Sequence, residues 1–194
     1  SRTYLAMHTK PRPPAESGCL VWFRRDLRCD DHRALNSGIA HAQLHGGRVW
    51  CVFVFDPDIL EPLPRADRRV EFIRDSLVDL DGQIGALARS HGIEGAGLLV
   101  RHGHPIDVVP QLAVRLGAQA TYANHDDEPA ALRRDAAVRG ALARAGIAMR
   151  TSKDHVVFER DDVRTAAGGA FSVYTPYKQA WLRRLSPDDL RAWL

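Results

Sequence analysis

Short apolar runs alternate with longer stretches of helical periodicity from residue 18 onward. Residues 19–23 form one continuous apolar run, which is typical of a strand covered on both faces. Residues 66–90 instead carry apolar side chains three or four positions apart, as in an amphipathic helix. The pattern predicts strands at 19–23, 49–55, 98–100, 120–123 and 147–150, the last together with residues 156–158. It predicts a first helix that begins at a cap at Asp30 or Asp31 and ends at Gly46. Four further helices are predicted at 66–90, 105–116, 128–145 and 175–194.

The regular alternation of strand and helix fixes the fold class that we expect. Five successive βα units predict an α/β fold with a doubly wound five-stranded parallel sheet, Rossmann-like, with helices on both faces. We expect residues 1–17 to be a flexible, proline-rich leader and residues 18–174 to form the sheet domain. Residues 175–194 are expected to be a helical linker that leads towards a further domain.

Composition narrows the class of protein. Of the 194 residues, 45% are hydrophobic and 26% are charged, which is typical of a globular domain, and no apolar run approaches the length of a membrane span. The three cysteines contain no CxxC pair, which argues against a disulfide framework and a zinc site and favours a reducing, cytoplasmic location. The net charge of +3 does not by itself indicate a nucleic-acid partner.

Charged segments follow three of the expected strands. In a doubly wound sheet, ligands bind beyond the carboxyl ends of the strands, where the strand order reverses. Residues 24–28 (RRDLR), 56–58 (DPD) and 124–128 (NHDDE) occupy such positions. Arginine could bind a carboxylate or phosphate, and Asp126 and Glu128 could accept hydrogen bonds from a heterocycle. The same side chains could instead pair with one another or cap helices.

Several familiar site signatures are absent from the sequence. The first strand is not followed by GxGxxG, and neither a Walker A sequence nor HExxH occurs. His102 and His104 flank Gly103, a spacing that does not define a metal site. From its residues alone, the chain is interpreted as a small-molecule-binding α/β domain without a catalytic residue and without a metal site.

Two longer motifs resemble the DNA photolyase and cryptochrome family. Residues 20–28 (LVWFRRDLR), followed by Asp31 and by Ala34-Leu35, resemble the opening strand and loop of this family. Residues 174–181 (YTPYKQAW) resemble the stretch at the end of its amino-terminal α/β domain. The resemblance extends over about residues 18 to 185. His32 is a departure, since the family usually has asparagine there.

The resemblance implies a domain that holds a light-harvesting antenna chromophore. A deazaflavin or FMN is the favoured chromophore. A reduced folate is less favoured because Ala130 and Ala131 stand where folate-type members often have Asn-Glu, and some members carry no antenna. The cofactor-binding residues implied by the resemblance are Phe53, Asp56, Arg69, Asn124, Asp126 and Glu128.

The parent protein would be a cyclobutane pyrimidine dimer photolyase, with damaged DNA as substrate and FAD in a carboxy-terminal domain that this chain lacks. The fragment alone would not be catalytic. A cryptochrome or (6-4) photolyase remains an alternative, as does a stand-alone nucleotide-binding protein. A further alternative is an interaction domain without a ligand, which is favoured if the charged residues pair with one another. The apolar face of residues 175–194, with Trp181 and Leu185, could also support self-association.

Overall fold

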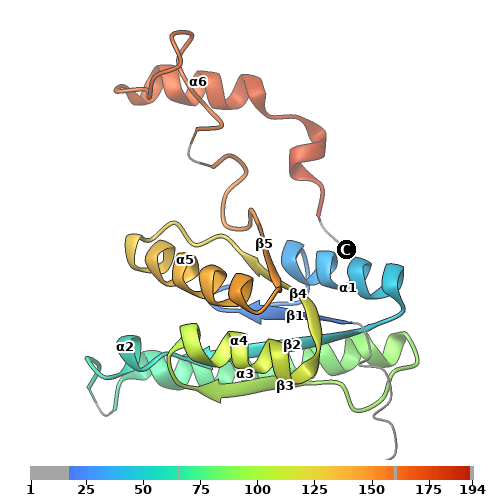
Figure 1. Cartoon of the computed structure of the whole chain (residues 1–194). Helices are drawn as coiled ribbons and strands as arrows, with labels where there is room; N and C mark the ends of the chain where they lie inside the picture. Colours follow the sequence, from blue (N-terminus) through green and yellow to red (C-terminus); the bar gives the residue numbers. More distant parts are fainter. Residues whose placement is uncertain (1–17, 65, 160, 193–194) are drawn as a thin grey trace, which may run out of the picture.

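The computed structural model describes residues 18–64, 66–159 and 161–192. Its centre is one parallel sheet in the order β3-β2-β1-β4-β5 (Figure 1). Parallel pairing continues along β1, where Cys19 lies opposite Val49 on one side and Ala120 on the other. The strands are β1 (Gly18–Phe23), β2 (Arg48–Phe55), β3 (Leu98–His102), β4 (Ala118–Asn124) and β5 (Ala148–Ser152).

Helices cover both faces of the sheet, as the sequence predicts. On one face, α1 (Arg33–His45) and α3 (Arg68–Ser90) pack against Cys19, Val21 and Phe23. On the other face, α4 (Pro105–Leu116) and α5 (Pro129–Arg144) pack against Leu20 and Trp22. Successive side chains of a strand point to opposite faces, so the fully buried β1 contributes to both cores. The predicted fold class, a doubly wound parallel sheet, is confirmed.

A close approach between α1 and β1 depends on one glycine. A Cβ atom on Gly38 would lie 2.6 Å from Cγ2 of Val21. That separation is far shorter than a van der Waals contact, so a larger residue would push the helix away from the strand. The helix ends at Gly46, whose φ of 67° is readily adopted only by glycine.

The cap of α1 differs from the prediction. His32, and not Asp30 or Asp31, is the N-cap, and its Nδ1 accepts a hydrogen bond from the backbone N–H of Leu35 at 2.9 Å. Asp31 has a φ of 50° and turns the chain one residue before the cap. Pattern reading favoured aspartate because it is a common N-cap, whereas here the buried ring of His32 supplies the cap.

Other boundaries also differ from the predictions. A short helix, α2 (Pro57–Leu60), follows β2, and residues 156–158 are not a strand. Helix α6 (Tyr174–Arg184) is followed by the 3₁₀ helix η1 (Pro187–Leu190), so the predicted helix at 175–194 ends early. The residue before a proline is disfavoured in the helical region, which explains the break at Ser186. The predicted leader lies outside the described residues, and the domain division at 174 stays a prediction.

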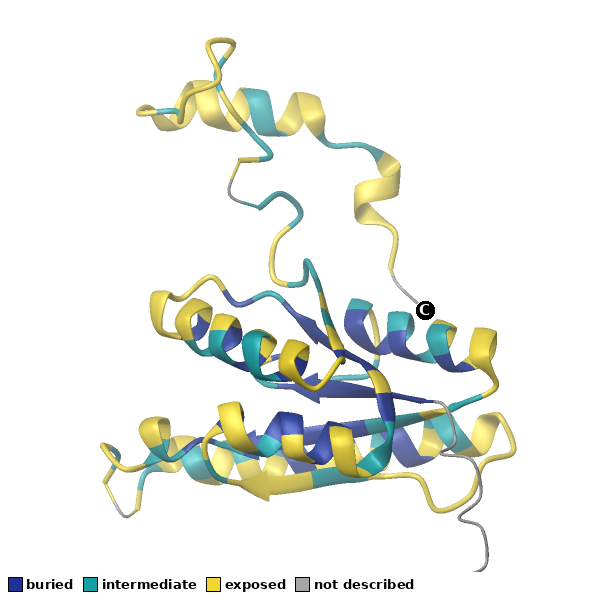
Figure 2. Ribbon diagram, in the orientation of Figure 1, coloured by how far each residue is buried: buried dark blue, intermediate teal, exposed yellow. Residues whose placement is uncertain are grey.

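Helix α6 stands clear of the sheet and its covering helices (Figure 1). Trp181 packs edge-on against Phe158, with 5.4 Å between ring centroids. The segment that carries Phe158 is fastened to the sheet by His125, whose Nδ1 lies 2.7 Å from a carboxylate oxygen of Glu159. Most of α6 is exposed (Figure 2). Among the described residues, no helix is both long and apolar enough to cross a membrane.

Candidate functional site

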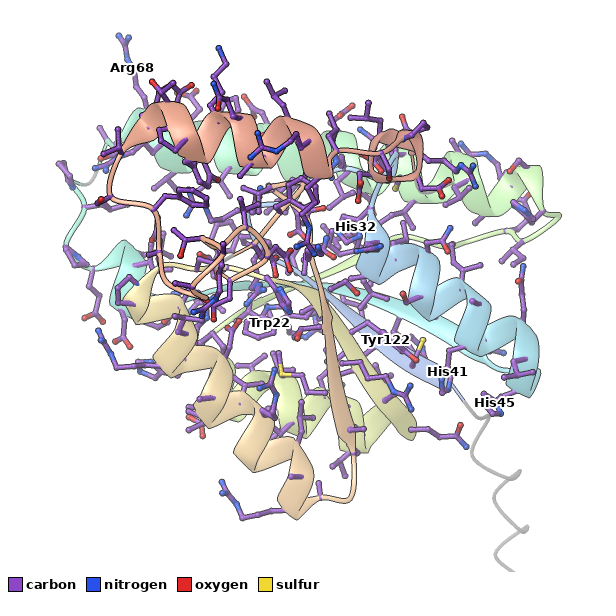
Figure 3. The ribbon with its side chains drawn as sticks, turned by 90° about the horizontal axis from the view of Figure 1, so that it is seen from above. Trp22, His32, His41, His45, Arg68 and Tyr122 are labelled. Carbon is purple, nitrogen blue, oxygen red and sulfur yellow. The ribbon has the colours of Figure 1, made fainter. Side chains whose placement is uncertain are left out.

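The strand order reverses at β1, which lies between β2 and β4. The loops after β1 and β4 therefore meet at the carboxyl edge of the sheet, at the position where doubly wound folds bind ligands. We call residues 24–28 and 124–128, with the first turns of α1 and α5, the β1/β4 rim. In the view of Figure 3, Trp22 and His32 lie near the middle of the molecule, well separated from Arg68.

The buried part of this rim is a closed hydrogen-bond network of Asp26, His32 and Asn124. The side-chain amide of Asn124 donates to Oδ2 of Asp26 at 2.8 Å, and its oxygen accepts from the backbone N–H of Ala34 at 3.0 Å. His32 Nε2 lies 2.8 Å from the same Asp26 oxygen. Since His32 Nδ1 accepts from Leu35, its Nε2 carries the proton and donates to Asp26. The amide of Asn124 is thus committed to the fold.

The surroundings of Asp26 favour its ionised form. Burial by itself would raise the pKa of this carboxyl, but the hydrogen bond from His32, together with that from the backbone N–H of Arg24, lowers the pKa to about 2. The backbone N–H of Arg24 donates to Oδ1 of Asp26 at 2.8 Å. A buried negative charge is therefore held at the start of the rim by neutral donors.

Arginines from two elements stack on Trp22. The guanidinium carbon of Arg24 lies 4.9 Å from the Trp22 ring centroid, and that of Arg134 lies 5.3 Å from it. Arg24 also forms an ion pair with Asp135 and donates to the backbone carbonyl of Asn124. Arg134 lies 3.1 Å from the other oxygen of Asp135. These contacts join α5 to β1 and β4, and they leave little of either arginine for a ligand.

The outer part of the β1/β4 rim is exposed and charged. Glu128 pairs with Arg25 at 2.5 Å, and the two side chains are 65% and 59% exposed. Asp126 is buried; its Oδ1 accepts from the backbone N–H of Glu128 at 3.2 Å, and Arg25 lies 3.8 Å away. The outer rim therefore offers the Arg25 fork and the Glu128 carboxylate to solvent, with Asp126 buried beside them. An exposed ion pair contributes little to stability, so it can exchange partners when a ligand arrives.

The three other predicted residues lie on the β2 side. Phe53 is buried in β2 and packs edge-on against Phe55, with 5.0 Å between ring centroids. Asp56 caps α2 through the backbone N–H of Asp58. Arg69 is exposed and pairs with Asp67, the N-cap of α3, at 2.6 Å. The structure thus brings Asn124, Asp126 and Glu128 together on one rim and places Phe53, Asp56 and Arg69 apart from them.

A cavity of about 340 Å³ lies beyond the same edge of the sheet, on the side of α1. Its walls come from the loop after β1, the segment after β5 and η1. Its lining includes the basic residues Arg33, Lys153 and Arg191 and the acidic residues Asp154 and Asp188. The sequence did not indicate this cavity, because residues 153–157 and 188–191 are brought together only by the return of the chain after α6.

Pattern reading also left three residues in or next to the β1/β4 rim outside the predicted site. Arg25 stood in the RRDLR segment, but only the structure pairs it with Glu128. Arg134 and Asp135 lie in the second turn of α5, where a helix pattern indicates solvent-facing positions. The sequence feature that could have indicated Arg134 and Asp135 is their charge near the start of the helix that follows β4. They lie about one turn beyond the motif at residues 124–128.

Comparison with known proteins gives a consistent family. The family model described as DNA photolyase matches residues 19–192. A deoxyribodipyrimidine photo-lyase from Halobacterium salinarum is 38% identical over 85% of the chain, which spans 34% of that protein's length. A Synechocystis cryptochrome structure has the same fold, with a TM-score of 0.74 at 21% identity. That match covers 89% of this chain and 35% of the cryptochrome chain. An archaeal photolyase from Sulfolobus tokodaii, solved with two FAD molecules, is 29% identical with a TM-score of 0.57. That match covers 74% of this chain and 32% of the archaeal chain.

Proposed function

Because this chain belongs to the DNA photolyase family, we propose that its sheet domain binds an antenna chromophore at the outer β1/β4 rim. The observation that carries the proposal is the exposed Arg25–Glu128 pair beside Asp126, at the point where the strand order reverses. Arg25 would donate to carbonyl or phosphate oxygens of the chromophore, and the two carboxylates would accept from its ring N–H groups.

The residues present fit a planar heterocycle with a polar edge. Besides the charged outer rim, α2 and α3 carry the large exposed apolar side chains Ile59 and Phe72, on elements that follow β2 at the same edge of the sheet. Exposed apolar side chains of this size are candidates for contact with an aromatic ligand. Phe53, Asp56 and Arg69 belong to the β2 side of this arrangement, and we propose them as its second wall.

A deazaflavin or flavin is the chromophore that we favour. The Sulfolobus tokodaii photolyase was solved with two FAD molecules and is described as implying a novel light-harvesting cofactor. Such a chromophore absorbs light and passes on the excitation, while the chain itself binds, orients and shields it. A reduced folate and an empty site are the remaining alternatives.

For the parent protein we propose light-driven repair of pyrimidine dimers in DNA, with FAD in a carboxy-terminal domain. The relatives named deoxyribodipyrimidine photo-lyase support it, at 33% and 38% identity. A cryptochrome is the second candidate, supported by a Cryptochrome DASH relative at 35% identity. Flipping a dimer out of the duplex requires a pocket beyond this sheet domain, so we propose that the chain alone is not catalytic.

The experiment is chromophore uptake by this chain. The purified protein is incubated with a deazaflavin, FMN, FAD or a reduced folate, and bound ligand is measured by absorption and fluorescence after gel filtration. We expect one deazaflavin or flavin per chain and at least a tenfold loss of affinity in Glu128→Gln. This substitution at an exposed position removes the negative charge of the side chain. The backbone N–H of residue 128 can still donate to the carboxylate of Asp126.

Glu94→Gln is the matched control. Glu94 is also exposed but lies before β3, at the opposite end of the sheet, so its substitution should leave the affinity unchanged. Equal loss in both variants, or no uptake of any of the four ligands, would overturn the antenna assignment. The family membership would stand in either case.

Partners of the parent remain proposals. We propose damaged DNA and the carboxy-terminal domain as partners, and self-association through α6, where Leu182 is exposed beside the half-buried Trp181. Light scattering of this chain at high concentration would show a dimer if α6 self-associates, and a monomer would refute it. The three cysteines are free thiols, which supports the proposed cytoplasmic location.

A further inference from the structure

Three potential metal ligands meet at the edge of the sheet beyond β2 and β3. We call Asp56, Asp58 and His104 the β2/β3 cluster. His104 Nδ1 lies 3.6 Å from Oδ2 of Asp58 and 3.9 Å from Oδ1 of Asp56. One ligand atom from each side chain lies within 4.8 Å of the other two. In a tetrahedral zinc site, metal–ligand bonds of 2.0–2.2 Å put neighbouring ligand atoms about 3.4 Å apart, so small rotations would complete the geometry.

The orientation of His104 has no explanation in helix capping. His104 is the N-cap residue of α4, yet its side chain makes no capping hydrogen bond and faces the two aspartates instead. In contrast, His32 in the same position of α1 does cap its helix through Nδ1. The β2–α2 and β3–α4 turns are thus connected by side chains directed towards one another.

The charge of the cluster also differs from that around Asp126 and Asp135. Two carboxylates near the start of α5 each have an arginine close by: Asp126 lies near Arg25, and Asp135 near Arg24. Within residues 18–64, 66–159 and 161–192, neither Asp56 nor Asp58 has a lysine or arginine within ion-pair distance. Two carboxylates therefore face one imidazole without a permanent cation between them.

We propose that the β2/β3 cluster binds a divalent transition-metal ion. One imidazole nitrogen with two carboxylate oxygens suits Zn²⁺ and its first-row neighbours better than Mg²⁺, which prefers oxygen ligands alone. Water would complete the coordination, because Asp58 and His104 are 77% and 51% exposed. The bound ion would fasten the β2–α2 turn to the β3–α4 turn. The proposal does not depend on the chromophore.

The cysteines are competing ligands that the structure disfavours. Burial raises the pKa of Cys19 and of Cys51 to about 12 and that of Cys29 to about 11. Only the thiolate binds metal well, so these thiols are poor ligands near neutral pH. A cobalt spectrum distinguishes the two sets, since thiolate ligation gives a strong near-ultraviolet charge-transfer band and ligation by nitrogen and oxygen does not.

The test is calorimetric titration of the untagged chain with Zn²⁺ at pH 7.5 in a non-coordinating buffer. We expect one ion per chain, with at least a tenfold weaker affinity in His104→Ala and in Asp58→Asn, and a Co²⁺ spectrum without a thiolate band. Asp56→Asn, which keeps a side chain able to cap α2, should weaken binding similarly.

His102→Ala is the matched control, because His102 is an exposed histidine two residues away that does not belong to the cluster. It should bind Zn²⁺ as the unaltered chain does. The proposal is overturned if the unaltered chain binds no Zn²⁺, if His104→Ala binds as tightly as the unaltered chain, if His102→Ala loses the same affinity, or if Co²⁺ shows thiolate ligation.

Discussion

The β1/β4 rim and the β2/β3 cluster lie at the same edge of one sheet but differ in how their polar side chains are used. On the first, Asn124 is 1% exposed and its amide hydrogen-bonds to Asp26 and to the backbone of Ala34. In the second, His104 is half-exposed and faces only carboxylates. The buried polar groups after β1 and β4 are thus hydrogen-bonded to one another, whereas the carboxylates after β2 face an imidazole without a neighbouring lysine or arginine among the described residues.

The contrast separates residues that build the fold from residues that remain available to a ligand. A buried amide with both ends bonded cannot turn to a ligand without leaving its partners unsatisfied. An exposed ion pair such as Arg25–Glu128 can be exchanged at small cost. The mutual pairing within the β1/β4 rim is what an interaction domain without a ligand would show, and the exposed Arg25–Glu128 pair is the part of that rim open to a ligand.

The largest effect should follow from Asn124→Ala. This change leaves the N–H of Ala34 without its acceptor and removes one of the donors to Asp26, at a cost of about 3 kcal/mol in the free energy of unfolding. Urea unfolding followed by circular dichroism measures it. Gln43→Ala, at an exposed position of α1, should change the free energy by less than about 0.5 kcal/mol. A loss below about 1 kcal/mol for Asn124→Ala would mean that the network is dispensable.

Acid should weaken the β1/β4 rim next. The folded-state pKa of Asp26 is lowered from 3.8 to about 2, so its ionised form stabilises the fold above pH 3.8, and this stability is lost as the pH falls from there through 2. The contribution at neutral pH is about 2 kcal/mol. The free energy of unfolding of Asp26→Asn should fall less between pH 5 and pH 2 than that of the unaltered chain. Parallel curves for the two proteins would contradict this role.

Zinc should stabilise the chain by a smaller amount. At a free Zn²⁺ concentration ten times the dissociation constant, binding to the folded state alone adds about 1.4 kcal/mol to the free energy of unfolding. Urea unfolding with and without Zn²⁺ measures the gain, which should vanish in His104→Ala. A gain that persists in this variant would place the stabilising ion elsewhere and remove the contrast between the two regions.

The smallest effect is expected for Arg69→Ala. Its guanidinium is exposed and its ion pair with Asp67 is a surface contact, so the urea midpoint should not change measurably. If Arg69 belongs to the second wall of the antenna site, chromophore affinity should fall nevertheless. A lowered midpoint would instead show that Arg69, like Asn124, serves the fold.

The sequence by itself determined the fold class, because burial on both faces of a parallel sheet leaves continuous apolar runs such as 19–23, and helices leave their own periodicity. The motif at residues 20–28 likewise carries the family resemblance in sequence alone. Boundaries were less certain where several polar residues competed for one role, as when His32 and not Asp30 or Asp31 capped α1.

Only the tertiary structure decided how each polar side chain is used. Asn124 and Asp126 are two residues apart and looked equivalent in sequence, yet the first bonds to β1 and α1 while the second lies beside the exposed Arg25. His104 looked like a loop residue until parallel pairing of β2 with β3 put it against Asp56. Hydrogen bonds and ion pairs act over a few ångströms in space, between residues far apart along the chain, so no local pattern of sequence records them.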